Sequence, residues 1–214
     1  ESKERNPLMR GLASSLVVLA TLAASACASD EPVMLSSSFT PSGRPAWASP
    51  LSSKALPTCR VSIGEVVDAR ADTQSMGRFG GRYVRRDDTV GWVRSGVETL
   101  ARDKRLEFVG AADVGDGVVL NVTLVKAYME GLATSKNSTV VLRVRYGRAG
   151  EAIGDATFRG DHTDVNWGSG DGEARDSLNI ALQEALAAID TDLFARCSKP
   201  PEPKPVPAGE PGVR

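Results

Sequence analysis

The sequence predicts a two-layer α+β domain, in which a mainly antiparallel sheet of about four to six strands is covered by two helices. Three observations predict this fold: β-branched segments that alternate apolar and polar residues, two amphipathic helical segments, and the order strand, helix, several strands, helix. With 214 residues, 41% of them hydrophobic and 25% charged, the composition is that of an ordinary globular protein. The patterned region, from residue 58 to residue 197, is long enough for one domain.

The first half of this region contains one strand, one glycine-rich turn and one helix. Arg60–Asp68 is rich in β-branched residues, which predicts a strand. The glycines and arginines of Gly77–Tyr83 are typical of a hairpin turn, and the alternative is a cradle for an anion. Asp88 or Thr89 then caps a helix that ends near Lys104, with valines and leucine on one face.

The second half contains the remaining strands and the longest helix. Alternating segments predict an antiparallel meander, after a short strand at Leu106–Val109. The broad apolar stripe of Glu173–Ala195 predicts a helix that covers the sheet. The meander strands are expected at Val118–Met129, Thr139–Tyr146 and Ala152–Arg159.

A short apolar segment before this domain is typical of an export signal. The run Leu16–Cys27 follows Met9 and Arg10 without an intervening acidic residue. At roughly 12 residues it is too short for a transmembrane helix, which needs about 20. We therefore expect residues 1–26 to be an upstream extension and a signal peptide, which is either processed at a lipidated cysteine or cut near Ala26 to leave a free thiol.

The end of this segment resembles the lipobox of bacterial lipoproteins. The residues Ala24–Ser25–Ala26–Cys27 carry the resemblance, which implies that Cys27 receives a diacylglyceryl group and becomes the first mature residue. Two or three acyl chains give stable anchoring to a membrane. In such proteins an Asp after the cysteine favours retention in the inner membrane. Ala28 stands there, so the resemblance implies a lipid anchor in the outer membrane, facing the periplasm.

Two segments flank the predicted domain. Residues 27–57 are rich in Ser, Pro and Ala, which predicts a flexible tether with isolated aromatic residues at Phe39 and Trp47. Residues 198–214 contain six prolines and predict an extended, disordered tail.

Two cysteines remain besides Cys27. Cys59 and Cys197 flank the patterned region, and an even number of cysteines in an oxidising compartment favours a disulfide over two free thiols. In the chain-entropy model such a bridge contributes roughly 4–5 kcal/mol.

Charge is balanced overall but uneven along the chain. The net charge of −1 argues against nucleic acid as a partner. Residues 78–105 are basic, whereas residues 151–192 are acidic. Either the basic segment binds anionic headgroups, glycans or an acidic partner, or the two segments lie close together and partly cancel. The candidate partner-binding arginines are Arg78, Arg82, Arg85 and Arg86.

The chain resembles the YajG-type family of bacterial lipoproteins. The resemblance rests on Cys27, on Val66–Arg70, on the glycine-rich loop and above all on Val165–Trp167 before the last helix. It implies an outer-membrane lipoprotein without established chemistry. Apart from the resemblance, Asn166 and Trp167 are further candidate partner-binding residues. The order of elements is also similar to that of the auxiliary lipoproteins of ABC-type lipid transport systems, in which case we expect an apolar groove between helix and sheet.

No motif in the sequence predicts catalysis. His162 lies between Asp161 and Asp164, which would suit a hydrolase, but the chain has no GxSxG nucleophile motif. A single histidine does not form the usual zinc site. We therefore expect no catalytic residue, metal site or cofactor. The sequence favours a non-enzymatic domain that binds an envelope protein, glycan or lipid, with a hydrolase that uses His162 as the alternative.

Overall fold

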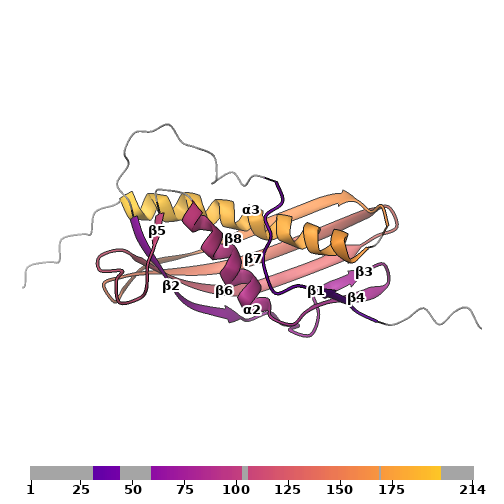
Figure 1. Cartoon of the computed structure of the whole chain (residues 1–214), viewed down its shortest axis with the longest axis horizontal. Coiled ribbons are helices and arrows are strands. Elements are labelled where there is room, and N and C mark those ends of the chain that lie inside the picture. The colour runs from indigo at the N-terminus through magenta and orange to yellow at the C-terminus, as the bar shows by residue number, and fades with distance from the viewer. Residues whose placement is uncertain (1–30, 44–58, 103–105, 169, 199–214) are drawn as a thin grey trace, which may run out of the picture. The chain divides into compact units, whose positions relative to one another are not determined.

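A computed structural model describes residues 31–43, 59–102, 106–168 and 170–198. From Pro32 onward these residues form an α+β domain in which a mixed sheet of eight strands is covered by two helices (Figure 1). The predicted fold class is confirmed, with more strands than the four to six expected. In chain order the elements are β1 (Val33–Leu35), β2 (Cys59–Asp68), β3 (Gly77–Phe79), β4 (Arg82–Arg86), α2 (Thr89–Glu98), the 3-10 helix η4 (Thr99–Arg102), β5 (Leu106–Phe108), β6 (Val118–Gly131), β7 (Ser135–Arg148), β8 (Glu151–Val165) and α3 (Asp171–Ser198).

Strand β6 is the centre of the sheet, because three strands pair with it. One edge of β6 pairs antiparallel with β7, and β7 pairs antiparallel with β8, which forms the predicted meander. On the other edge, the first half of β6 pairs in parallel with β2 and the second half in parallel with β3. Strand β5 extends the sheet beyond β2, and β4 and β1 extend it beyond β3.

The strand directions define two ends of the sheet. One end, which we call the hairpin end, carries the β3–β4 turn at Gly80–Gly81, the β6–β7 turn at Leu132–Thr134 and the loop that follows β8 at Asn166. The first residue of β1 also lies there, since β1 runs parallel to β4 and therefore away from the β3–β4 turn. The opposite end carries the β7–β8 turn and the start of β2.

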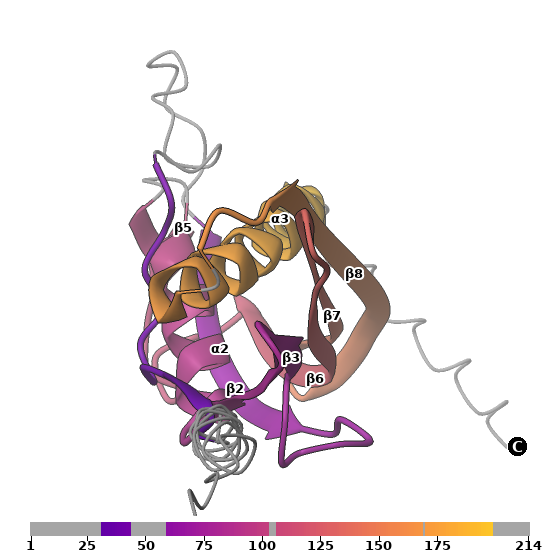
Figure 2. The ribbon, with the colours of Figure 1, turned by 90° about the vertical axis from the view of Figure 1, so that its right-hand side faces the viewer.

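Both helices cover the same face of the sheet, as predicted. The Asp88 carboxylate caps α2 by accepting a hydrogen bond of 2.6 Å from the Gly91 backbone N–H. The Trp92 indole donates a hydrogen bond of 2.8 Å to the Asn179 side chain, which joins α2 to α3. Viewed from the hairpin end, the sheet curves around the two helices (Figure 2).

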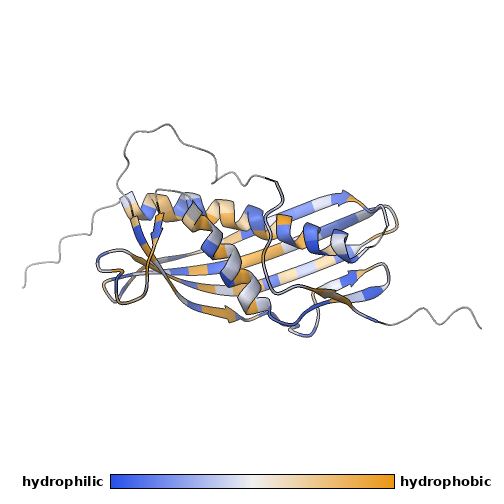
Figure 3. Ribbon diagram, in the orientation of Figure 1, coloured by the Kyte–Doolittle hydropathy of each residue, from blue (hydrophilic) through white to orange (hydrophobic). Residues whose placement is uncertain are grey.

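Alternating side chains separate a dry face of the sheet from a solvated one. Hydrophobic and hydrophilic positions alternate along the long strands (Figure 3). In β6 and β7 one set of positions is fully buried under α2 and α3, whereas the other set includes the exposed Arg143 and Arg145. The chain therefore has one helix-covered face and one helix-free face.

Residues 31–43 differ from the flexible tether expected for residues 27–57. The Val33–Leu35 segment forms β1 beside β4, and its first and last side chains, Val33 and Leu35, are buried. Phe39, predicted to be an isolated aromatic, is also buried, and its backbone N–H donates to the Ser95 hydroxyl. The burial of three apolar side chains orders this segment against the domain. Trp47, the rest of the expected tether and the proline-rich tail from residue 199 lie outside the described residues.

The predicted disulfide between Cys59 and Cys197 is present. It joins the start of β2 to the last turn of α3 across a sequence separation of 138 residues, with the two Cα atoms 5.8 Å apart. In the described part of the chain, no helix combines the length and the hydrophobicity that a membrane crossing requires. Cys27 and the expected signal peptide lie outside the described residues.

Candidate functional site

Three of the four candidate arginines lie on the surface of the β3–β4 hairpin. Arg78 and Tyr83 are cross-strand neighbours, and the guanidinium of Arg78 lies 4.3 Å from the centre of the Tyr83 ring. Arg85 is exposed on the same side of β4. Arg82 forms an ion pair of 2.8 Å with Asp171, the first residue of α3. The basic and acidic segments of the sequence thus meet at this point, and Arg78 and Arg85 remain available to solvent.

Arg86, the fourth candidate, points into the domain and is only 7% exposed. Its guanidinium lies 4.3 Å from the centre of the Trp92 ring, and Nη1 donates to the Ser36 carbonyl oxygen. Nε and Nη2 have no hydrogen-bond partner among the described residues. Burial, and secondarily the nearby Arg70 cation, lowers the pKa of Arg86 to about 9. Arg86 is therefore a core residue of the described structure and contributes no exposed charge.

Asn166 and Trp167 lie at the hairpin end, beside the β6–β7 turn. The Asn166 side chain donates to the Leu132 carbonyl oxygen at 3.1 Å, and its backbone N–H donates to the Thr134 carbonyl oxygen. Trp167 is 82% exposed, and its backbone N–H donates to Glu173 in the first turn of α3. Asn166 thus holds the loop against the sheet, while the indole of Trp167 projects into solvent.

The structure places both candidate segments at one end of the domain. The Arg82–Asp171 ion pair connects the β3–β4 hairpin to the start of α3. Asn166, in the loop between β8 and α3, connects that loop to the β6–β7 turn. Phe79 of the hairpin lies directly beside Gly131, where β6 ends. Residues that are more than 80 positions apart in the sequence therefore form one surface.

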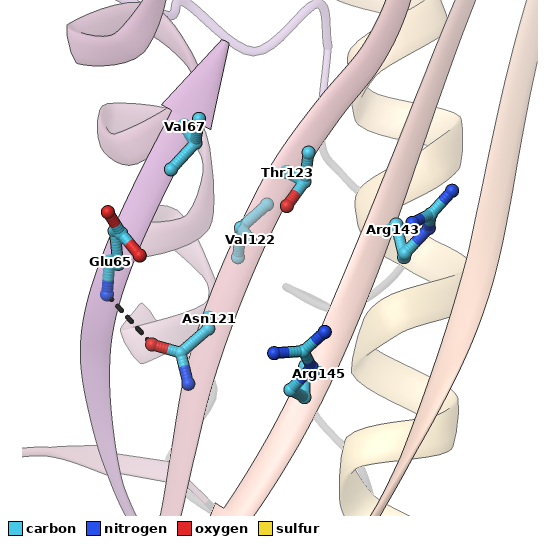
Figure 4. A pocket seen from close by; sticks show the side chains of 7 residues that line it. All are labelled: Glu65, Val67, Asn121, Val122, Thr123, Arg143 and Arg145. Atoms are coloured by element: carbon cyan, nitrogen blue, oxygen red, sulfur yellow. Dashed lines mark hydrogen bonds between the residues drawn. The ribbon is translucent and has the colours of Figure 1, made fainter. Parts of the chain in front are cut away.

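A second site, a pocket of about 280 Å³, lies on the helix-free face. Figure 4 shows side chains from three neighbouring strands around it: Glu65 and Val67 from β2, Asn121 and Thr123 from β6, and Arg143 and Arg145 from β7. The Asn121 side chain accepts a hydrogen bond of 3.0 Å from the Glu65 backbone N–H at a bulge in β2. The Arg145 guanidinium points toward Asn121 (Figure 4).

Neither Arg143 nor Arg145 forms an ion pair with another described residue. Arg143 and Arg145 lie two residues apart on β7, so their Cα atoms are separated by about 7 Å. Each guanidinium group offers donors that suit a carboxylate or a phosphate, and in Figure 4 that of Arg143 is turned away from Asn121 and Arg145. Sequence reasoning missed this pocket, although the alternation in Thr139–Tyr146 already indicated that Arg143 and Arg145 point outward.

The residues around His162 do not form a catalytic arrangement. Because side chains alternate along β8, Asp161 and His162 lie on opposite faces of the sheet. Hydrogen bonds from Arg159, and next from Thr139, hold the pKa of Asp161 below its usual range. Ser138 lies opposite His162, but its hydroxyl is buried and is hydrogen-bonded to Ser177 at 2.7 Å. Among the described residues, His162 has no hydrogen bond to a serine or to an acid.

The described residues also contain no group of three or more His, Cys, Asp or Glu side chains placed to hold a metal ion. The described residues present two groups that could contact a ligand: Arg143 and Arg145 on the helix-free face, and the exposed aromatic side chains at the hairpin end.

No protein-family model and no curated protein matches the sequence. Solved structures do match the fold. A protein from Xanthomonas campestris, described by the family model DUF330, is 10% identical, with 76% of this chain and 99% of that chain covered at a TM-score of 0.50. A minor lipoprotein from Acinetobacter baumannii (10% identity, 64% and 93% coverage) and a lipoprotein from Neisseria meningitidis (13%, 64% and 99%) give TM-scores of 0.42 and 0.35. The chain therefore shares its fold with the Xanthomonas protein.

Proposed function

We propose that this chain is an outer-membrane lipoprotein, anchored through lipid on Cys27, whose periplasmic domain binds an anionic partner in the envelope without catalysing a reaction. The observation that carries the binding role is the pocket on the helix-free face. Its two arginines have no ion-pair partner among the described residues, and a further donor, the Asn121 amide, lies beside Arg145.

The composition of the pocket favours recognition of one charged group in a polar setting. Arg143 and Arg145 supply planar, bidentate donors for a carboxylate or a phosphate. Thr123 adds a hydroxyl, and Glu65 on the opposite wall favours a ligand that also presents a hydrogen-bond donor or a cation. Val67 provides the apolar part of the wall.

The two alternatives have less support. A hydrolase would need His162 within reach of a nucleophile, and Ser138 is instead bound to Ser177 beneath α3. An auxiliary lipoprotein of a lipid transport system was expected to carry an apolar groove between helix and sheet. Buried side chains of α3 and the sheet fill that interface in the described residues, and the pocket lies on the other face.

The anchor is tested by membrane partitioning of the wild type and of Cys27→Ala. We expect the wild type in the outer-membrane fraction after density separation, and the variant in the soluble fraction or as unprocessed precursor. A soluble wild type that the substitution does not change would contradict the anchor. Wild type in the inner-membrane fraction would contradict the proposed location.

The pocket is tested by a photoreactive amino acid placed at Thr123 in living cells. We expect a crosslinked product that the double substitution Arg143→Glu and Arg145→Glu removes. The matched control is Arg60→Glu with Arg175→Glu, which changes the net charge equally at two exposed residues outside the pocket. Absence of a product at Thr123, or equal loss in both double variants, would refute binding at this pocket.

A further inference from the structure

Exposed apolar side chains gather at the hairpin end. Trp167 and Leu132 are 82% and 48% exposed, and the Asn166 side chain, bound to the Leu132 carbonyl oxygen, holds the two segments together. Val165 is the last residue of β8, opposite Ser135 at the start of β7. Eight large hydrophobic side chains are well exposed among the described residues, and six of them lie at or near this end: Met34, Tyr83, Tyr128, Leu132, Val165 and Trp167. Such clustering marks an interaction surface.

The chain enters the domain at this same end. Val33 pairs with Val84, and β1 runs away from the hairpin end, so the residues that precede β1 leave the domain there. Cys27 lies six positions before Val33. Six residues span at most about 20 Å when fully extended. A lipid on Cys27 therefore keeps the hairpin end within about 20 Å of the membrane surface.

The charges at this end suit a surface of anionic phospholipid. Arg78 and Arg85 are exposed and form no ion pair with a described residue. Two carboxylates of the same end are neutralised, Asp171 by Arg82 and Asp164 by Lys136. Glu130, which is also exposed, lies opposite Arg78. Trp and Tyr side chains favour the boundary between headgroups and acyl chains, and nearby arginines are attracted to anionic headgroups.

We infer that the hairpin end docks on the surface of the phospholipid bilayer, with Trp167 and Leu132 inserted at the headgroup boundary and Arg78 and Arg85 against the headgroups. This inference rests on the proposed anchor at Cys27, which supplies the proximity. Docking gives the domain a fixed orientation. Arg143 is eight residues along β7 from Ser135, so the pocket is held up to roughly 26 Å from the membrane surface.

The test uses the processed protein, lipidated on Cys27, in vesicles of phosphatidylethanolamine and phosphatidylglycerol. The acyl chains of these lipids carry bromine near the headgroup end. Bromine quenches a tryptophan only at short range. The chain has three tryptophans, Trp47, Trp92 and Trp167, and Trp92 is fully buried. We expect brominated lipid to quench wild-type emission, and we expect Trp167→Phe to lose the Trp167 share of that quenching.

The matched control moves the tryptophan to the opposite end of the sheet. Ile153 is exposed beside the β7–β8 turn, about 40 Å along the strands from the hairpin end. In a Trp167→Phe background, Ile153→Trp should restore emission without restoring quenching.

Flotation of the vesicles on a density gradient separates the two proposals. Protein that floats, with equal quenching in wild type and Trp167→Phe, overturns docking and leaves the anchor standing. Equal quenching of a tryptophan at position 153 and at position 167 likewise overturns docking, because the domain then lies flat. Protein that does not float overturns the anchor and docking together.

Discussion

Tyr146 shows how tightly α3 closes over one end of the sheet. Its side chain is fully buried, and the Arg196 guanidinium lies 4.2 Å from the centre of its ring. Burial, followed by the neighbouring Asp192 carboxylate, raises the pKa of the Tyr146 hydroxyl above its usual value of about 10. The folded protein therefore keeps this proton at a pH at which the unfolded chain releases it.

This difference predicts a loss of stability at high pH. A tyrosine whose pKa is raised by folding contributes stability that is complete below about pH 10 and falls as the pH rises further. Relative to Tyr146→Phe, we expect the wild type to lose up to about 1.4 kcal/mol of unfolding free energy per pH unit above pH 10; the comparison isolates Tyr146, because the lowered pKa of Arg86 acts equally in both proteins. Urea unfolding at several pH values measures it. Tyr128→Phe, at an exposed ring, is the control, and an undiminished fall in Tyr146→Phe would refute the assignment.

At the scale of single residues, the alternation of side chains along a strand is the most informative sequence signal. Val84 is buried, so the pleat of β4 turns Arg86 inward and Arg85 outward. Charge alone places Arg85 and Arg86 together on one basic surface, whereas alternation separates them. Alternation likewise places Asp161 and His162 on opposite faces of β8. Alternation alone does not identify the partners of Arg86, because the Trp92 ring reaches it from the next helix and the Ser36 carbonyl from a segment 50 residues away.

At the scale of elements, helix α3 approaches the sheet closely at Gly160. A methyl group there would collide with the Ala181 carbonyl oxygen and lie 2.6 Å from the Ala185 nitrogen. The contact places α3 directly over β8, and only glycine leaves room for it.

We therefore expect Gly160→Ala to lower the free energy of unfolding by about 1–3 kcal/mol, because α3 must shift or the backbone must distort. Urea unfolding provides the measurement. Gly168→Ala is the matched control, since a methyl group at that position meets no atom within 4 Å. A Gly160→Ala protein as stable as the wild type would show that α3 is not held this closely against β8.

The elements that sequence reasoning found are those whose signal is local. Both helices and the three meander strands show the periodicity of their own residues, and their predicted ranges lie within those observed or close to them. Strand β1 has only three residues in a segment rich in Ser and Pro, and it is held by β4 and by burial of Phe39. The parallel pairing of β2 and β3 with β6 depends on contacts far apart in the chain, which periodicity does not report.

At the scale of the whole domain, the two ends of the sheet differ in character. The hairpin end receives the chain that follows Cys27 and carries exposed aromatic side chains. The opposite end is closed by the Cys59–Cys197 bridge and by Arg196, which donates to the Ile153 carbonyl oxygen of β8. One end is thus suited to contact and the other to holding α3 in place.

The bridge should be the largest single contribution to stability at that closed end. By linking residues 138 positions apart, it restricts the unfolded chain, and in the chain-entropy model this contributes about 4–5 kcal/mol. We expect a protein with Cys59→Ser and Cys197→Ser to unfold at a clearly lower urea concentration than the oxidised wild type. Reductant should bring the wild type to the midpoint of the double variant and leave that variant unchanged. Equal midpoints for the oxidised wild type and the double variant would mean that the packing of α3 against β7 and β8 alone holds the two ends of the chain together.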